Sequence, residues 1–363
     1  MPDPLRAGII GRGFMGQVHA HAVRVAGGRL TTIAATSFSS AKQGAVELGA
    51  MRPASSPEDL IASPDVDVVH ICTPNDSHSS LAAAALDAGK HVICEKPLAT
   101  GLPDAESLLA RAVTSGLVTA VPFVYRSYAP VREARARIAS GEAGRVHSLH
   151  GHYLQDWMAD PTRTNWRVDA GTGGPSRAFA DIGVHWCDLV EFVTGQQIVR
   201  LVANTGTIWP TRGPAGDERP VTTEDLVSLL FETDQGAQGT LTVSQASLGR
   251  KNQLAFSIDG TKASYQFDQE SPDRLTVGSE AMTSVLARGP SFRAAAQRYV
   301  NLPPGHPQGY QDAFNAFVAD VYESIGGQPV EGLPTFDAGV RAARLSAAVL
   351  ESSAQRRWVE VPG

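Results

Sequence analysis

The chain has 363 residues, of which 42% are hydrophobic and 19% are charged, and its formal net charge at pH 7 is −6. This length suits two domains, and the composition is typical of a globular protein. The acidic balance and the lack of a lysine- or arginine-rich run argue against nucleic acid and membrane surfaces as partners. The sequence also lacks a bilayer-length apolar stretch and a signal-peptide pattern, and its three cysteines are widely spaced, so we expect a cytoplasmic protein with reduced thiols.

Residues 1–124 alternate short apolar runs with helical patterns. This alternation is typical of a parallel sheet that helices cover on both faces. Helix signals agree, because Ser56 and Pro57 offer an N-cap and a first-turn proline, and an alanine-rich run ends at Gly89. The predicted strands cover residues 6–10, 30–35, 66–72, 91–94 and 118–121.

A Gly-x-Gly-x-x-Gly segment, from Gly11 to Gly16, follows the first predicted strand directly and opens a helix. In this strand–turn–helix context the spacing is a strong signal for a dinucleotide site. Gly11 permits the tight turn, Gly13 allows a pyrophosphate to approach the backbone, and Gly16 allows the helix to pack on the sheet. The start of the helix, with Phe14 and Met15, would hold the anion. We therefore predict a doubly wound Rossmann domain that binds NAD or NADP.

The predicted second strand ends without the carboxylate that would accept a free ribose 2′-hydroxyl. Ser37 can accept either a hydroxyl or a phosphate. Lys42 either pairs with a phosphate or is an ordinary solvated helix residue. The choice between NAD and NADP therefore stays open.

Two further segments lie at the carboxyl ends of predicted strands, where a doubly wound sheet binds its ligand. A lysine at such a position can hydrogen-bond a reacting hydroxyl, and burial beside the nicotinamide charge would lower its pKa and make it a proton partner. By spacing alone, however, a surface lysine is the safer interpretation of Lys96. The candidate cofactor residues in these segments are Thr73, Pro74, Asn75, His78, Glu95 and Lys96.

The pattern changes in residues 125–363, where longer strand signals and Asp-Gly turns indicate an α+β domain with a large, mostly antiparallel open sheet. The Gly- and Pro-rich residues 210–220 favour a surface loop, and residues 284–307 show no clear period. We predict helices at residues 131–139, 310–325 and 336–353, the last able to pack back on the first domain. The predicted strands cover residues 145–157, 200–209, 225–233, 239–246, 254–258, 263–267 and 358–361.

Asp181 and His185 are four positions apart, so a helix would place them on one face. An imidazole titrates near neutrality and can take the proton of a secondary alcohol while hydride leaves the carbon. Asp181 can orient the substrate or the ring. The simpler alternative is a core histidine beside Trp186.

Taken together, the glycine segment, the Thr-Pro-Asn and Glu-Lys-Pro segments and the Asp-x-x-x-His sequence resemble the glucose–fructose oxidoreductase / inositol dehydrogenase / rhizopine catabolism (Gfo/Idh/MocA) family. The resemblance spans essentially the whole chain. It implies an NAD(P)-dependent dehydrogenase that oxidises a secondary hydroxyl of a sugar, glycoside or cyclitol. It also implies that Lys96, Asp181 and His185 are the catalytic residues.

Residues 151–157 and 165–167 look like the levoglucosan dehydrogenase branch of this family. This likeness implies an uncharged polyol substrate, with aromatic rings against its C–H faces. Arg177 stands where smaller apolar residues are usual and leaves open a substrate with an acidic group. The candidate substrate contacts are Tyr153, Gln155, Trp166 and Arg167.

Two other functions remain open within the same fold. One is a non-catalytic sugar or dinucleotide sensor, against which the intact Lys96, Asp181 and His185 count. The other is a glycosidase that uses bound NAD transiently. Net reduction of added cofactor would separate a dehydrogenase from both.

Two expectations concern metals and assembly. His150 and His152 share one face of a predicted strand, but without neighbouring carboxylates or cysteines in the sequence we predict no metal site. Residues 225–231 alternate so that Val227, Leu229 and Phe231 share one face, and the opposite sheet face is broad and uncharged. We expect that face to join a homodimer or homotetramer.

Overall fold

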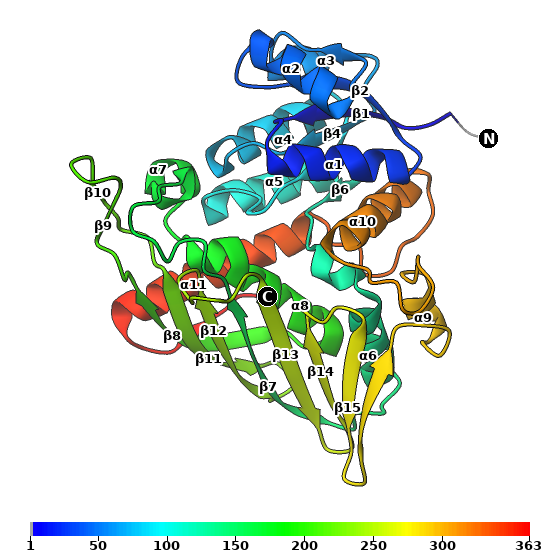
Figure 1. Cartoon of the computed structure of the whole chain (residues 1–363), viewed down its shortest axis with the longest axis vertical. Coiled ribbons are helices and arrows are strands. Elements are labelled where there is room, and N and C mark those ends of the chain that lie inside the picture. Colours follow the sequence, from blue (N-terminus) through cyan, green and yellow to red (C-terminus); the bar gives the residue numbers. More distant parts are fainter. Residues whose placement is uncertain (1–2) are drawn as a thin grey trace. The chain divides into compact units, whose positions relative to one another are not determined.

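The computed structural model describes residues 3–363 (Figure 1). Contacts divide the chain into two compact units. The first unit contains the described residues up to Val124 and the segment Tyr310–Val340, and the second contains Tyr125–Gly309 and Arg341–Gly363. The first unit thus includes a C-terminal segment that lies far from the rest of the unit in sequence.

A six-stranded parallel sheet forms the centre of the first unit, in the order β3-β2-β1-β4-β5-β6. The strand order reverses between β1 and β4, and in such sheets the ligand crevice lies at the carboxyl ends of the strands beside this point. The five strands predicted from apolar runs are present, and the two-residue β3 is additional. The strands are β1 (Arg6–Ile10), β2 (Arg29–Ala34), β3 (Arg52–Pro53), β4 (Val68–Ile71), β5 (His91–Cys94) and β6 (Thr119–Ala120).

Two helix signals of the first unit, a start at Ser56 and a stop at Gly89, are confirmed. Ser56 accepts a hydrogen bond from the backbone N–H of Asp59 at the start of α3, which has Pro57 at its first position. The chain leaves α4 through Gly89, whose φ of +72° favours glycine. The helices are α1 (Phe14–Val25), α2 (Phe38–Leu48), α3 (Pro57–Ala62), α4 (His78–Asp87), α5 (Leu102–Ser115) and α10 (Tyr310–Ile325).

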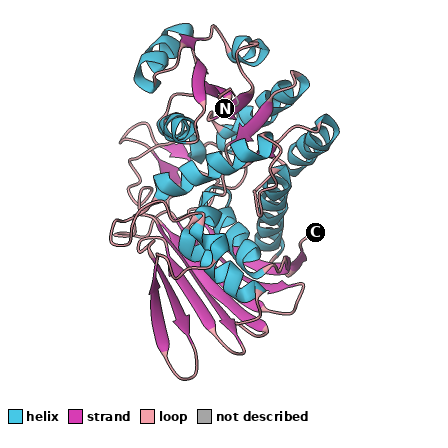
Figure 2. Cartoon of the chain, turned by 90° about the vertical axis from the view of Figure 1, so that its right-hand side faces the viewer, coloured by secondary structure: helices cyan, strands magenta, loops and turns pink. Residues whose placement is uncertain are grey.

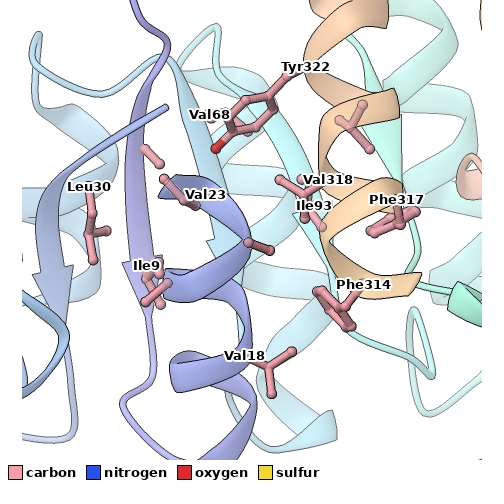
Figure 3. Packing of buried hydrophobic residues seen from close by; sticks show 14 of the residues in the cluster. Ile9, Val18, Val23, Leu30, Val68, Ile93, Phe314, Phe317, Val318 and Tyr322 are labelled. Carbon is pink, nitrogen blue, oxygen red and sulfur yellow. The ribbon is translucent and has the colours of Figure 1, made fainter. Parts of the chain in front are cut away.

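The core of the first unit lies between the sheet and the pair α1 and α10 (Figure 3). Val18 and Val23 of α1 and Phe314 and Val318 of α10 are buried against strand residues such as Ile9. Complete burial of one such side chain contributes about 1.5–3 kcal/mol. This packing explains why α10 belongs to the first unit although almost two hundred residues separate it from β6.

A nine-stranded sheet dominates the second unit, in the order β16-β15-β14-β13-β7-β12-β11-β8-β17. All its pairs are antiparallel except β7 with β12, which are parallel. The strands are β7 (Val146–Leu154), β8 (Ile198–Gly206), β11 (Leu226–Thr233), β12 (Gln238–Ser244), β13 (Gln253–Gly260), β14 (Ser264–Asp268), β15 (Arg274–Gly278), β16 (Thr283–Ala287) and β17 (Val359–Glu360).

Helices cover one face of this sheet (Figure 2), and its two faces differ in burial. On β11, Val227 and Leu229 are buried, whereas Leu230 is 50% exposed and Ser228 is exposed. The buried face packs against α6 and α8.

Further helices and helical turns of the chain are η2 (Val124–Ser127), α6 (Ala129–Ala139), η3 (Trp166–Val168), α7 (Ala170–Gly173), η4 (Phe179–Gly183), α8 (Val184–Thr194), α9 (Ala294–Gln297) and α11 (Phe336–Gln355).

Several predictions for the second unit were wrong in detail. The supposed surface loop at 210–220 contains a small hairpin of β9 (Thr211–Arg212) and β10 (Arg219–Pro220). The hairpin of β15 and β16 was missed, because β16 lies at the sheet edge, where its exposed positions need no strong apolar pattern. Residues 179–183 are π-helical rather than α-helical, so Asp181 and His185 do not share one uniform α-helix.

Candidate active site

The glycine turn connects β1 to α1 in a geometry that only small residues permit. Gly11 has a φ of +109°, and a Cβ atom there would lie 2.5 Å from the carbonyl oxygen of Cys72. A Cβ on Gly16 would lie 2.3 Å from the Gly11 carbonyl oxygen. At Gly13, in contrast, no atom lies within 4 Å of a Cβ position, so the backbone there is open to a ligand.

The N-terminus of α1 carries no side-chain cap. Gly13 is the N-cap residue, and the first backbone N–H groups of the helix therefore lack a side-chain acceptor. Phe14 is 69% exposed, whereas Met15 packs against the core, where its sulfur lies 3.9 Å from the Tyr310 hydroxyl. An uncapped helix start next to an open glycine fits the phosphate groups of a dinucleotide.

The carboxyl end of β2 leads into α2 without a carboxylate. Ser37 caps α2, because its hydroxyl accepts the backbone N–H of the residue three positions on, at 3.1 Å. The Lys42 ammonium lies 4.5 Å from the centre of the Phe38 ring. The nearby Arg12 guanidinium, which the sequence interpretation did not single out, pairs with Glu47 at 2.8 Å. Cations and a hydroxyl thus stand where a 2′-substituent of the ribose is usually met.

The loop after β4 is held by local hydrogen bonds. Pro74 precedes the 3-10 turn Asn75–Ser77, and the Ser77 hydroxyl donates to the Thr73 hydroxyl at 2.7 Å. Asn75 is buried. These bonds fix the loop at the carboxyl edge of the sheet. The loop follows β4, which lies two strands from β2 in the sheet.

His78 connects this loop to the Glu-Lys-Pro segment. Its Nδ1 lies 2.7 Å from the Pro97 carbonyl oxygen, and its Nε2 lies 2.9 Å from the Thr73 carbonyl oxygen. Burial lowers the pKa of His78 although both carbonyl groups favour the charged ring. The ring is buried, so the structure gives His78 the role of a brace between two loops.

Glu95 follows β5 and is buried, and its two oxygens have different partners. Oε1 lies 3.2 Å from His19 Nε2, and Oε2 accepts the backbone N–H of Lys96 at 3.2 Å. Burial alone would raise the pKa of Glu95, but the hydrogen bond from His19 and the charge of Lys96 outweigh it, and the pKa is lowered. The carboxylate is therefore ionised at neutral pH. Lys96 itself is half-buried and is joined to Pro97 by a cis peptide bond.

In the second unit, Asp181 lies on the π-helical turn that precedes α8. Its Oδ2 accepts a 2.7 Å hydrogen bond from the Gln245 side chain, and its Oδ1 lies 3.3 Å from Arg167 Nε. The Arg167 guanidinium is stacked 4.2 Å from the centre of the Trp166 ring. One predicted substrate residue, Arg167, therefore contacts a predicted catalytic residue, and a second, Trp166, packs on Arg167.

His185, on the first turn of α8, faces a group of neutral polar side chains. Its ring lies edge-on to Tyr125, with centroids 5.2 Å apart, and 6.4 Å from Tyr153. The two tyrosine hydroxyls are 2.5 Å apart, and Asn252 Oδ1 accepts hydrogen bonds from Tyr153 at 2.8 Å and from Gln155 at 2.7 Å. Hydroxyl and amide groups in this arrangement suit a ligand rich in hydroxyl groups.

The suggestion that Arg177 meets an acidic substrate is wrong. Its side chain is completely buried and pairs with Asp225, which also accepts a 2.7 Å hydrogen bond from Arg212. The other end of the guanidinium donates to Gln245 at 3.2 Å. Arg177 therefore supports the residue that holds Asp181, and its charge is used within the protein.

The sequence interpretation missed residues that these contacts bring to the site. Asn252 and Gln245 come from strand ends far along the chain from Asp181. An isolated amide side chain belongs to no sequence motif from which its role could be predicted. His19 had a signal, since a polar residue on the buried face of a helix needs a partner. Within residues 3–363, no cluster of three histidine, cysteine or acidic side chains forms a candidate metal site.

An open glycine turn at the crevice of a doubly wound sheet, joined to a second sheet unit with a histidine–aspartate pair, defines the class of dinucleotide-binding oxidoreductases. Residues 5–123 match the model of the oxidoreductase family with an NAD-binding Rossmann fold, and residues 131–266 match the GFO/IDH/MocA C-terminal domain. The chain belongs to the Gfo/Idh/MocA family and is an NAD(P)-dependent dehydrogenase.

Similar proteins of known name agree over the full length. Levoglucosan dehydrogenase of Pseudarthrobacter phenanthrenivorans is 32% identical, with 99% of this chain and 98% of that protein covered. A structure of levoglucosan dehydrogenase with NADH and L-sorbose has a TM-score of 0.94 at 31% identity, covering 99% of each chain. An inositol dehydrogenase homologue of Azotobacter vinelandii, with NADH and myo-inositol, has a TM-score of 0.88 at 26% identity, covering 99% and 98%. Among the helices of the described residues, none has the length and apolar character needed to span a bilayer.

Proposed function

We propose that the protein oxidises a secondary hydroxyl group of an uncharged sugar, glycoside or cyclitol. The observation that carries this proposal is the set of neutral hydrogen-bonding groups around His185, formed by Tyr125, Tyr153, Gln155 and Asn252. Hydroxyl and amide groups can each donate and accept, as a polyol does. Arg177 of this unit supports the same choice, because its charge is neutralised by a buried carboxylate.

The residues of the first unit fit a nicotinamide dinucleotide. The uncapped start of α1 and the open backbone at Gly13 suit the pyrophosphate, and the Thr-Pro-Asn loop and Glu95 lie at the same edge of the sheet. When bound, such a cofactor accepts the hydride from the carbinol carbon. The family model names NAD as the ligand of this domain.

Two side chains are assigned to the proton of the reacting hydroxyl. His185 takes this proton in its neutral form, as hydride leaves the carbon, and Lys96 donates a hydrogen bond to the reacting oxygen. Asp181 orients the substrate or the imidazole. The carboxylate is held in place by Gln245 and Arg167, so its direction is fixed before a ligand arrives.

Names of relatives support the substrate class. Solved structures of similar proteins include complexes with levoglucosan, L-sorbose and myo-inositol. The half-buried Trp166 and Arg167 offer an aromatic and a cationic surface that suit the C–H faces and hydroxyls of such rings. We assign Tyr153, Gln155, Trp166 and Arg167 to substrate binding.

Assembly through the second-unit sheet is part of the same proposal. One face of that sheet is packed against helices, whereas the other presents Leu230, Thr240, Thr242 and Val285 to solvent in the single chain. These four positions are uncharged, and on the same face Arg200 and Glu232 neutralise each other in a 2.7 Å ion pair. A broad face of this kind suits a self-complementary two-fold contact. We propose a homodimer or homotetramer formed there.

The direct test of the function is net reduction of added cofactor. Purified protein would be mixed with NAD or NADP and with sugars, glycosides, sugar acids and inositols, one at a time. Reduction with a neutral polyol supports the proposal. A sensor would reduce no cofactor, and a glycosidase would release an aglycone without net reduction.

A further inference from the structure

A chain of hydrogen-bonded polar side chains runs from Glu95 through the core of the first unit. His19 Nε2 lies 3.2 Å from Glu95 Oε1, and His19 Nδ1 lies 2.8 Å from His70 Nδ1. His70 Nε2 in turn lies 3.0 Å from the Tyr322 hydroxyl. We call His19, His70 and Tyr322 the His–His–Tyr chain. Both histidines are 0% exposed, and Tyr322 is 7% exposed.

These side chains stand where apolar residues would normally pack. His70 is in the middle of the buried strand β4, and the ring of His19 lies 4.6 Å from the Phe314 ring. Tyr322 extends from α10 beside Val68 within the apolar cluster (Figure 3). Polar groups in such surroundings cost free energy unless every hydrogen bond is made. An uninterrupted apolar core would avoid that cost, so the arrangement indicates a use beyond packing.

With a neutral His19, one arrangement of protons satisfies the whole set. The ionised Glu95 can only accept, so His19 carries its proton on Nε2 and its Nδ1 becomes an acceptor. His70 then donates from Nδ1 to His19, and its Nε2 accepts the proton of the Tyr322 hydroxyl. Burial lowers the pKa of His70 well below its usual value and raises the pKa of Tyr322, so both stay neutral.

The opposite direction of hydrogen bonds requires one more proton, either on Glu95 or on the His19 ring. If His19 carried its proton on Nδ1, its Nε2 lone pair would face Glu95, which would then have to be protonated to donate. Breaking the donor at the Tyr322 end removes a partner that favours the first direction. The protonation of the Glu95–His19 pair is therefore coupled to the Tyr322 hydroxyl of α10.

We propose that the His–His–Tyr chain positions Glu95: it keeps the carboxylate ionised and its plane fixed beside Lys96. This proposal rests on the function proposed above. One carboxylate oxygen is held by His19 and the other by the Lys96 backbone N–H, so the negative charge has a set place next to the lysine assigned to the reacting oxygen. Protonation of Glu95 would remove that charge and would change the hydrogen bonds of the Glu-Lys-Pro segment.

Other titratable groups lie near the His–His–Tyr chain. His78 on α4 and Lys96 face Glu95, and burial keeps His78 neutral. The thiols of Cys72 and Cys94 also face the carboxylate, and burial raises the pKa of both, so they carry no charge. Asp67 is the carboxylate that acts on the Tyr322 hydroxyl, and it raises the pKa of Tyr322 further. The charge of Lys96 lowers the pKa of Glu95, as do the charges of His19 and His78 where these rings are protonated.

The first experiment needs no substrate. Nitrogen-15 spectra of the histidine rings distinguish the neutral tautomers, and we expect an Nε2–H ring for His19 and an Nδ1–H ring for His70 at neutral pH. In Tyr322→Phe, which removes a single oxygen, we expect the His19 tautomer to change at a pH about one unit higher than in the unaltered protein. Charged rings for both histidines at neutral pH would overturn the proposal, even if the protein oxidised no polyol.

The second experiment measures turnover against pH with bound cofactor. We expect kcat/KM of Tyr322→Phe to fall at a pH about one unit higher on the acid side, and by about tenfold at a fixed acidic pH. His19→Gln keeps a donor for Glu95 and should retain more activity than the similarly sized His19→Leu. In a Glu95→Gln background the change at Tyr322 should have no further effect on the acid limb.

The matched control is Tyr265→Phe, which removes a buried tyrosine hydroxyl from β14 of the second unit. Its pH profile should equal that of the unaltered protein. If Tyr322→Phe is folded, active and has the same acid limb as this control, the His–His–Tyr chain has only a structural role and the proposal is wrong. If the unaltered protein oxidises no polyol, the proposed function is wrong. The nitrogen-15 spectra still test the hydrogen bonds proposed for the His–His–Tyr chain.

Discussion

Gln245 donates a 2.7 Å hydrogen bond to the Asp181 carboxylate while its carbonyl oxygen accepts from Arg177 at 3.2 Å. A guanidinium can only donate, so it fixes which end of the amide faces which neighbour. The amide N–H therefore always points at Asp181. Arg177 itself is held by the buried Asp225, and this series of contacts sets the direction of a proposed catalytic carboxylate.

Replacing Gln245 by glutamate should lower turnover. A second carboxylate against Asp181 would repel it and would raise the pKa of one of the two acids. We expect kcat to fall about 10- to 100-fold in Gln245→Glu, and by less in the neutral Gln245→Met. Steady-state kinetics on the folded variants would measure this. The control is Gln238→Met, at an exposed position of β12, the strand that ends just before Gln245. Equal kcat in all these variants would contradict the role of Gln245.

Asp225 should control stability in acid. Burial opposes its ionisation, but the hydrogen bonds and charges of Arg177 and Arg212 outweigh burial and lower its pKa. Because the folded pKa lies below the unfolded value, the stabilisation is complete above the unfolded pKa and is lost as pH falls through the folded pKa. The contribution of Asp225 to the free energy of unfolding should therefore disappear as the pH is lowered below the unfolded pKa of an aspartate and through the folded pKa.

The same carboxylate can be tested by substitution. Asp225→Asn leaves two buried guanidinium groups without a counter-charge, and we expect the free energy of unfolding to fall by about 3–5 kcal/mol. Denaturant titration at neutral pH would measure the loss. The exposed Asp217→Asn should stay within about 0.5 kcal/mol of the unaltered protein. An equally small change for both would show that the buried pair is not stabilising.

Much of this organisation was predictable, and the reasons for the exceptions are physical. The parallel sheet and the glycine turn follow from local signals: apolar strands, caps and a glycine at positive φ. The contacts of Asp181 do not, because Gln245 and Arg167 reach it from distant segments through tertiary packing. The π-helical turn before α8 was also hidden, since residue spacing cannot distinguish it from an α-helical turn.

Arg177 shows a second kind of exception. An arginine next to a catalytic segment suggests an anionic ligand when its neighbours are unknown. Its counter-ion, Asp225, is almost fifty residues away in sequence, and the sequence holds no spacing rule that connects the two. Whether a charge is available to a substrate therefore depends on burial and partners, which the fold alone supplies.

The ribose end of the cofactor site should decide between NAD and NADP. Ser37→Asp keeps a cap for α2 and adds a carboxylate that can accept ribose hydroxyls but repels a 2′-phosphate. We expect the ratio of kcat/KM for NAD to that for NADP to rise about tenfold or more. Ser39→Asp, which adds the same charge two residues further on at an exposed position, is the control. An unchanged ratio in Ser37→Asp would place the ribose elsewhere.

Charge placed on the open sheet face should break the oligomer. Leu230 is 50% exposed on β11 of the single chain, and a lysine there would have to be buried in the proposed contact. We expect sedimentation velocity to show a dimer or tetramer for the unaltered protein and a monomer for Leu230→Lys. Val113→Lys, on an exposed position of α5, should leave the assembly intact. A monomeric unaltered protein at micromolar concentration would contradict this part of the account.

The central claim is that this chain transfers hydride from a polyol to a nicotinamide cofactor, with Lys96 at the reacting oxygen. The most direct measurement is the appearance of reduced cofactor when the protein is mixed with NAD or NADP and a panel of neutral sugars, glycosides and inositols. The account predicts reduction with at least one of them, and a loss of about 100-fold or more in a Lys96→Met variant that still folds and binds cofactor. Lys262→Met, at an exposed position, should retain activity. No reduction with any neutral polyol, or undiminished turnover in Lys96→Met, would contradict it.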